Sequence, residues 1–320
     1  MARPLPQPVR TVMGVVRVAT KVGLIADPIK ALEKPHAERL TREHPTFLAG
    51  KVDTSIQTWD DTVDGRGGPI EVRVYARKDL QPGAPAILFI HGGGFIDGGL
   101  AFTDNVQRGL AQRTGYVVVG LSYRLAPEHP FPAGLEDCQD VLQWMVDKQP
   151  HGLDPHRLAV AGESAGGNLA AALAISNRDG ARLPILHQTI IYPFTDTRLL
   201  SPDWDTSTMP GVGRAQGELM VKLYAGDEKD NPLVSVLHAD LAGLPPAMVI
   251  SCEHDPLKSD SIWYADALAA AGVETHHRHY DNMPHGYLVI PGIVREARTS
   301  LDEIAIEIAK RLGPSHAVAG

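Results

Sequence analysis

A serine between small residues is the first candidate for chemistry in this chain. Ser164 lies at the centre of GESAGG, residues 162–167, which contains the pattern G-x-S-x-G. An apolar run over 158–162 leads into the motif, and an Ala-rich stretch over 165–177 follows it. This order predicts a strand, a sharp turn and a helix, with glycines that leave room for a strained turn exposing the serine hydroxyl. The alternative is an ordinary serine that caps a helix.

A second glycine-rich segment also follows a strand pattern. HGGGF occupies residues 91–95, directly after the apolar run 86–90. Successive glycines lose much conformational entropy on folding, which indicates a backbone requirement. We expect Gly93 and Gly94, with Ala165 as a third donor, to direct N–H groups at an oxygen that becomes negative during a reaction. A flexible turn is the alternative. A phosphate-binding loop is disfavoured, because neither G-x-x-x-x-G-K-[ST] nor G-x-G-x-x-G occurs.

A serine nucleophile needs a base and a carboxylate that orients the base. Asp255, in SCEHDPL, and His285, in MPHGY, each follow a predicted strand, so both are expected in loops at strand ends. We therefore predict Asp255 as the acid and His285 as the base, with Glu253 and Asp281 as secondary candidates for the acid. His91 is expected to orient the glycine-rich loop.

Three neighbouring histidines raise the question of a metal site. His276, His277 and His279 fall in a predicted strand over 274–280. His277 and His279 would share one face of that strand, and His276 would point to the other. No carboxylate or thiol stands at ligand spacing beside them, so we expect a solvated edge strand and neither a metal nor a cofactor.

The elements that must position these residues alternate between strands and helices. A hairpin is predicted over 55–62 and 69–77, and further strands at 86–90, 116–123, 158–162, 185–192, 247–252 and 274–280. Helices are predicted at 103–113, 135–148, 165–177, 259–271 and 295–312. This alternation predicts an α/β fold, in which helices cover both faces of a mostly parallel sheet.

Two segments do not follow the alternation. Residues 1–45 are helical in pattern and precede the first strand, and residues 196–228 interrupt the rhythm of strands and helices. We expect them to form a helical cap at the carboxyl ends of the strands, where ligands bind in such folds. The core then comprises 46–195 and 229–320. A plain surface loop is the alternative for 196–228.

The stretch from Val9 to Ala26 predicts an amphipathic helix, with Arg10, Arg17 and Lys21 beside a valine-rich face. Arg17 and Lys21 interrupt the apolar segment of this stretch, and no small-residue cleavage site follows it. Both features argue against a signal peptide. We expect the valine face to pack on the protein. Peripheral contact with a membrane surface is the alternative.

The composition excludes several classes of function. With 43% hydrophobic and 21% charged residues, the 320-residue chain is typical of a globular protein. Its 30 Lys and Arg against 38 Asp and Glu give a net charge of −8, which argues against nucleic acid as a partner. No apolar run approaches the roughly 18 residues of a membrane-spanning helix. Cys138 and Cys252 alone cannot build a disulfide framework, which fits a cytoplasmic protein. The sequence leaves open whether the chain forms a homo-oligomer.

Several motifs together resemble those of the hormone-sensitive-lipase family of esterases, of the bacterial type. The motifs are HGGGF, YRLAPEHPFPAG (123–134), GESAGG, YPFTD (192–196), EHDPL (253–257) and PHGY (284–287). They cover about residues 70–290 in order, which makes them far more specific together than singly. The resemblance implies an α/β-hydrolase fold with a helical cap, and it implies these roles: nucleophile Ser164, acid Asp255, base His285, and oxyanion donors Gly93, Gly94 and Ala165.

The resemblance also implies an activity. We expect hydrolysis of a small-molecule carboxylic ester with a short to medium acyl chain, through an acyl-serine and without a cofactor. An amidase or deacetylase with the same triad is an alternative. A non-catalytic binding protein of the same fold is another, which the intact triad disfavours. The chain departs from the family at Glu163, where Asp or Thr is usual, and at Asp97, where a small or apolar residue is commoner.

Overall fold

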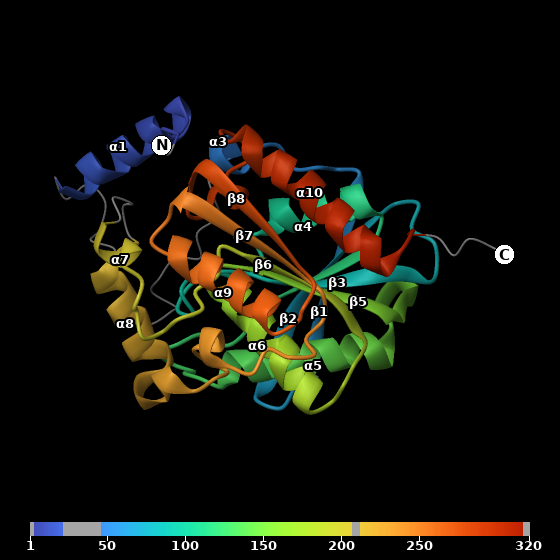
Figure 1. The fold of residues 1–320 in the computed structure, drawn as a ribbon. Helices are drawn as coiled ribbons and strands as arrows, with labels where there is room; N and C mark the ends of the chain where they lie inside the picture. The colour runs from blue at the N-terminus through green and yellow to red at the C-terminus, as the bar shows by residue number, and fades with distance from the viewer. Residues whose placement is uncertain (1–2, 22–45, 207–211, 316–320) are drawn as a thin grey trace.

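An eight-stranded sheet forms the centre of the molecule in a computed structural model that describes residues 3–21, 46–206 and 212–315 (Figure 1). The strands are β1 (Ile56–Gly65), β2 (Gly68–Arg77), β3 (Ala84–Ile90), β4 (Val117–Leu121), β5 (Leu153–Glu163), β6 (Ile185–Ile191), β7 (Ala247–His254) and β8 (Thr275–Pro284). Their order across the sheet is β1-β2-β4-β3-β5-β6-β7-β8.

The sheet is mostly parallel. The hairpin β1–β2 joins the rest through an antiparallel pairing of β2 with β4, and all later pairings are parallel. In the centre Leu88 of β3 pairs with Val119 on one side and Val160 on the other. Every residue of β3 is buried. Its continuous apolar run is typical of a strand that is covered on both faces. The predicted α/β fold is confirmed.

Helices cover both faces of the sheet, as Figure 1 shows. Helices α4 (Asp104–Thr114) and α10 (Arg295–Leu312) pack on one face, through residues such as Leu110 and Ile304. Helices α5 (Ala133–Lys148), α6 (Ala165–Asp179) and α9 (Lys258–Ala270) pack on the other, through residues such as Leu169 and Tyr264. Each face therefore has its own apolar core.

The strand ends differ from the prediction in two places that matter. Strand β5 begins at Leu153, earlier than the predicted 158, because Leu153 pairs with Ala84 before the regular register starts. Strand β8 continues past the predicted residue 280 to Pro284, which pairs with His254 of β7 after a shift in register. His285 therefore follows the strand directly.

Helix α1 (Gln7–Lys21) packs against the protein through Val9 and Met13. Val9 is buried, and Met13 contacts the same core. Just before the helix, the Arg3 N–H donates to the Asp281 carbonyl at 3.1 Å. These contacts favour packing over a membrane-surface anchor. The rest of the predicted segment, residues 22–45, lies outside the described residues.

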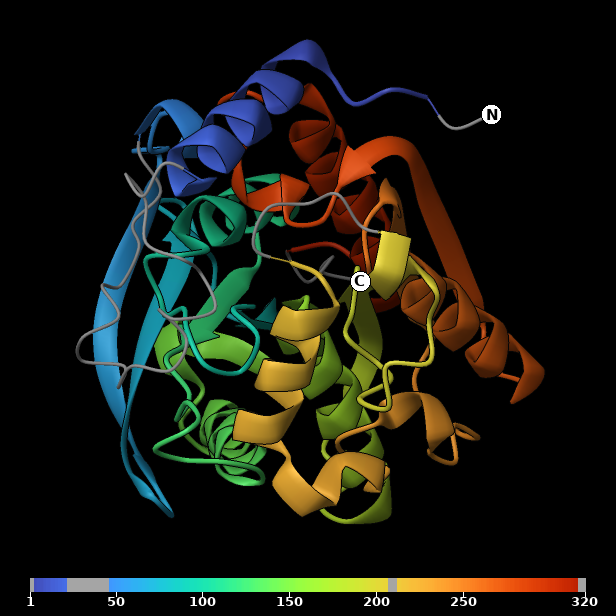
Figure 2. The same ribbon diagram turned by 90° about the vertical axis from the view of Figure 1, so that its left-hand side faces the viewer.

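The segment 196–228 contains α7 (Asp203–Thr206), α8 (Arg214–Tyr224) and the start of a 3-10 helix, Gly226–Asp230. Trp204 of α7 is buried against Phe194, with 5.3 Å between ring centroids, so the segment is no plain surface loop. Helices α1, α7 and α8 lie at the end of the sheet where β7 and β8 finish, and Figure 2 looks onto this end.

The remaining helices are short. They are α3 (Thr46–Ala49) and the 3-10 helices Pro150–Gly152, Val236–His238 and Tyr287–Val289. Across the ranges that the structure describes, no helix combines the length and the apolar character needed to cross a membrane.

Helix α10 offers a matched test of the packing. Ile304 is fully buried under the sheet, whereas Ile306 of the same helix is 61% exposed. Ile304→Ala should lower the free energy of unfolding by about 2–5 kcal/mol, because it leaves a cavity. Ile306→Ala should change it by less than about 0.5 kcal/mol. Urea denaturation of both variants measures the difference, and equal losses would contradict the placement of α10.

Candidate active site

Ser164 sits on a strained turn between β5 and α6. Its backbone has φ 57° and ψ −120°, a region that a residue with a side chain rarely adopts. Two glycines allow the turn. A Cβ added to Gly162 would lie 2.1 Å from the Gly166 carbonyl oxygen, and one added to Gly166 would lie 2.2 Å from the Ile90 carbonyl oxygen. The turn therefore presents the serine as its spacing predicted.

The structure brings the three predicted side chains together. The Ser164 hydroxyl lies 2.9 Å from His285 Nε2, and His285 Nδ1 lies 2.9 Å from Asp255 Oδ2. The Asp255 carboxylate is fully buried and the imidazole nearly so. With the ring proton on Nδ1, His285 donates to Asp255 and accepts from Ser164. A hydroxyl, an imidazole and a carboxylate thus lie in one hydrogen-bonded row, the arrangement that a serine nucleophile with a base and an orienting acid requires.

The other candidate acids have different partners. Glu253 pairs with Lys258 at 3.5 Å and with His279 at 3.2 Å. Asp281 pairs with Arg3 at 3.2 Å. Of the three carboxylates, Asp255 is therefore the one that contacts the imidazole of His285.

The loop after β7 holds Asp255 in place. The Leu257 N–H donates to Asp255 Oδ1 at 2.7 Å, and the Lys258 N–H donates to the Asp255 carbonyl at 3.1 Å. These bonds form the turn that leads into α9 and leave Oδ2 for His285. The acid is thus oriented from both sides.

Charge around His285 favours its protonated form. Burial lowers the pKa of the imidazole, but the charge of Asp255, its hydrogen bond and the charge of Glu163 together outweigh burial. The pKa of His285 therefore lies above its ordinary value. Such a base is well matched to hold a proton while a reaction intermediate exists.

The glycine-rich loop folds back beside the serine turn. Gly93 and Gly94 have φ of 114° and 64°, and a Cβ on Gly93 would lie 2.0 Å from the Asp97 carbonyl oxygen. The Ile96 and Asp97 N–H groups both donate to the Gly93 carbonyl. Ala165 begins α6, so its N–H belongs to the first turn of the helix, which lacks intrahelical acceptors.

His91 orients this loop. Its Nδ1 lies 2.6 Å from the Gly92 carbonyl oxygen, and its ring stacks on Tyr123 with 4.3 Å between centroids. The Tyr123 hydroxyl in turn donates to the His91 carbonyl at 3.1 Å. These contacts fit the role expected for this histidine from the sequence.

Two residues at the site were not anticipated from the sequence. Tyr192 packs edge-on against the His285 ring, with 4.9 Å between centroids. Met220 of α8 covers the glycine-rich loop so closely that a Cβ on Gly94 would lie 2.7 Å from its sulfur. In the sequence, Tyr192 is the first residue of YPFTD and Met220 lies in the helical pattern of α8. Neither feature indicates which distant residue the side chain contacts.

The histidine cluster has polar partners that spacing along the strand did not reveal. Ser251 Oγ lies 2.8 Å from both His277 Nε2 and His279 Nδ1. Carboxylates also approach, Glu253 from β7 and Glu307 from α10. Spacing along the strand therefore did not show the carboxylates that the fold brings near these histidines. Even so, no group of His, Cys, Asp and Glu in the described residues is placed to hold a metal.

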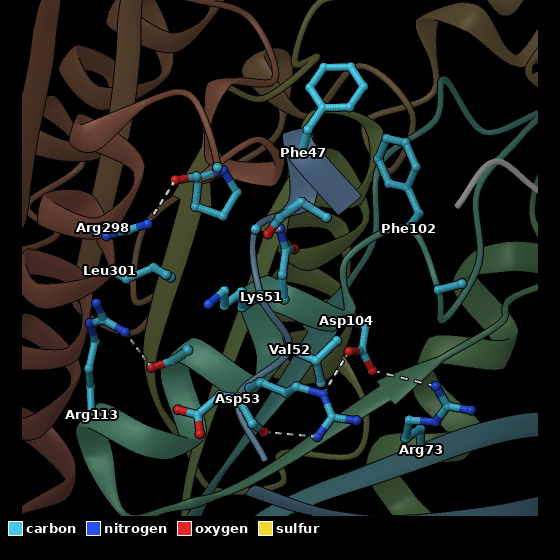
Figure 3. Close-up of a pocket in the computed structure, with 18 residues that line it drawn as sticks. Phe47, Lys51, Val52, Asp53, Arg73, Phe102, Asp104, Arg113, Arg298 and Leu301 are labelled. Atoms are coloured by element: carbon cyan, nitrogen blue, oxygen red, sulfur yellow. Dashed lines mark hydrogen bonds and ion pairs between the residues drawn. The ribbon is translucent and has the colours of Figure 1, made fainter. Parts of the chain in front are cut away.

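A hollow of about 1010 Å³ lies apart from this site, between α4, α10 and the segment 47–53 (Figure 3). Arg73 and Arg108, which line it, both pair with Asp104. None of Ser164, Asp255 and His285 belongs to its lining. The hollow therefore provides no part of the candidate active site.

The strained turn gives a second test. Gly166→Ala should lower the free energy of unfolding by about 1–3 kcal/mol, because the added methyl group meets backbone atoms of β3 that cannot rotate away. The control is Gly14→Ala in α1, where an added Cβ meets nothing within 4 Å. That variant should be neutral or more stable by up to about 1 kcal/mol. Denaturant unfolding that ranks the two variants in the opposite order would contradict the geometry of the turn.

Comparisons with known proteins agree with this geometry. The family model described as alpha/beta hydrolase fold matches residues 87–289. Carboxylesterase NlhH of Mycobacterium tuberculosis is 38% identical over 234 residues, covering 69% of this chain and 73% of that protein. Ethyl acetate hydrolase of Pseudomonas putida is 32% identical over 284 residues, covering 86% and 89%.

Solved structures show the same similarity. The hyperthermophilic esterase from the archaeon Pyrobaculum calidifontis superimposes with a TM-score of 0.79 at 32% identity, covering 96% of this chain and 99% of that one. The chain therefore belongs to the α/β hydrolase family, among the esterases of the hormone-sensitive-lipase type that its motifs resemble.

Proposed function

We propose that this chain is a serine carboxylesterase in which Ser164 is the nucleophile, His285 the base and Asp255 the acid. The observation that supports it best is the unbroken pair of 2.9 Å contacts from the Ser164 hydroxyl through His285 to Asp255. The substrate is a small-molecule carboxylic ester, and the residues present need no cofactor for this chemistry.

The first half of the reaction forms an acyl-enzyme. His285 Nε2 takes the Ser164 proton as the oxygen attacks the ester carbonyl, and Asp255 stabilises the imidazolium that results. The carbonyl oxygen becomes negative in the tetrahedral intermediate, where the N–H groups of Gly93, Gly94 and Ala165 stabilise it. The alcohol then leaves with the proton from His285.

The second half releases the acid. Water attacks the acyl-serine while His285 takes its proton, which gives a second tetrahedral intermediate with the same oxyanion donors. That intermediate collapses as the bond to Ser164 Oγ breaks, and His285 returns the proton to the serine oxygen. Only neutral His285 acts as a base. Since the pKa of His285 is raised, activity should be lost as the pH falls through that raised value and be regained above it.

Replacement of the triad residues tests the assignment. Ser164→Ala and His285→Ala should each reduce kcat by about 10⁴- to 10⁶-fold with the fold intact, because the triad acts as a unit. Asp255→Asn should also reduce it steeply. Glu253→Gln is the control and should stay near wild type. Activity within tenfold of wild type for either alanine variant would refute the roles, and a collapse in the Glu253 variant would assign the acid to that residue.

The same measurement separates the competing functions. A panel of chromogenic esters and anilides distinguishes an esterase from an amidase or deacetylase, which would favour the anilides. A non-catalytic binding protein would turn over neither class. We expect turnover of the esters.

We also propose that 1–45 and 196–228 form a cap that limits the acyl chain. Support comes from α8, whose Met220 lies against Gly94 and whose Tyr224 stacks on Phe95 with 3.8 Å between centroids. A wall so close to the proposed oxyanion donors would restrict the acyl pocket, and with the family resemblance it supports a preference for roughly two to eight acyl carbons. The relative named ethyl acetate hydrolase fits a short acyl chain.

Met220 provides the test of this cap. Met220→Ala removes the wall above Gly94, so kcat/KM should shift toward longer acyl chains, with each added methylene gaining up to about 1 kcal/mol. Leu200→Ala is the control, because Leu200 is 62% exposed. Hydrolysis of p-nitrophenyl esters over a series of acyl lengths measures both profiles. If wild type and the Met220 variant have the same dependence of kcat/KM on acyl length, α8 does not line the acyl pocket.

A cytoplasmic location is the last part of the proposal. Cys138 and Cys252 are both buried free thiols, which suits a reducing compartment. Burial raises the pKa of each thiol well above its ordinary value, so neither is a ready nucleophile.

A further inference from the structure

The residue before the nucleophile contacts the glycine-rich loop. Glu163 ends β5, and its Oε1 accepts the Gly92 N–H at 2.6 Å inside the protein. The carboxylate lies so close that a Cβ on Gly92 would be 2.2 Å from the same oxygen. A direct bond therefore joins the strand that carries Ser164 to the loop that carries Gly93 and Gly94.

Glu163 also lies behind the base. Its side chain is buried and its charge acts on His285, and Tyr192 packs edge-on against the His285 ring. The charged and titratable groups that face His285 are Asp255 from the loop after β7, Glu163 from β5 and Tyr192 after β6. Tyr123, after β4, faces Glu163 from the other side.

We propose that Glu163 is a positioning residue for the reaction: it fixes the oxyanion loop relative to Ser164 and places a second negative charge beside His285. The inference rests on the proposed function. It assigns a role to Glu163, whose carboxylate reaches Gly92 from the residue before Ser164.

The electrostatics agree with this geometry. The pKa of Glu163 lies above its ordinary value, because burial outweighs the charge of His285 and the Gly92 N–H, which both favour the ionised carboxylate. In return, Glu163 adds to the effect of Asp255 in raising the pKa of His285. When His285 takes the serine proton, two buried carboxylates rather than one therefore stabilise the imidazolium.

Two variants separate the two parts of the proposal. Glu163→Gln removes the charge but keeps an oxygen that can accept the Gly92 N–H. The acid limb of the kcat/KM profile should then move to lower pH by about one unit, because His285 loses a raising charge. Glu163→Asp keeps the charge but shortens the reach to Gly92. We expect kcat to fall by about tenfold to a hundredfold, with KM and the acid limb little changed.

Glu253→Gln is the matched control, because it neutralises another glutamate that faces Lys258 and His279. Its profile should stay that of wild type. A merely structural role for Glu163 would lower the unfolding temperature and the active fraction, but it would not move the acid limb. If the acid limb of the kcat/KM profile does not shift in Glu163→Gln, the proposed effect of the Glu163 charge on His285 is wrong. If kcat in Glu163→Asp stays within twofold of wild type, the proposed role of Glu163 in positioning the loop is wrong.

An NMR titration of the His285 imidazole nitrogens tests the charge without turnover. In the resting protein, the pKa of His285 should be lower in Glu163→Gln than in wild type and in Glu253→Gln. If wild type hydrolyses no ester, the proposed function fails, and the titration still decides whether Glu163 acts on His285. Equal values in all three proteins overturn that action whatever the activity.

Discussion

The strained backbone at Ser164 is the constraint on which the rest of the site depends. A positive φ at a residue with a side chain persists only where the surroundings enforce it. Here β5 enters the turn fully buried, α6 leaves it fully packed, and Gly166 lies against the carbonyl oxygens of Ile90 and His91. The turn and the glycine-rich loop are thereby packed together, so Ser164 and the loop that carries Gly93 and Gly94 share one rigid support.

Buried charge is the second constraint. Asp255 and Glu163 approach His285 from different strands, and each has a backbone N–H as partner, from Leu257 and Gly92 respectively. Each amide thus does more than hold a loop, because it fixes the place of a carboxylate whose charge acts on His285.

Much of this arrangement follows from local sequence, and the rest depends on contacts between distant segments. That Ser164, Asp255 and His285 lie together was predictable because each follows a predicted strand, and parallel strands end at one edge of a sheet. The contact of Glu163 with Gly92 could not be predicted, since their separation in the sequence does not indicate how far apart they lie in space. Likewise the spacing of His276, His277 and His279 could not show that β7 and α10 supply Glu253 and Glu307.

The cap and the oxyanion loop are coupled through one aromatic pair. Tyr224 at the end of α8 stacks on Phe95, the residue that closes HGGGF, and its carbonyl accepts the Phe131 N–H at 2.8 Å. Phe95 itself accepts the Ala126 N–H at 2.9 Å through its carbonyl. A displacement of α8 would therefore also displace the loop that carries Gly93 and Gly94. Because Glu163 accepts the Gly92 N–H and Tyr224 stacks on Phe95, the glycine-rich loop is held at both ends.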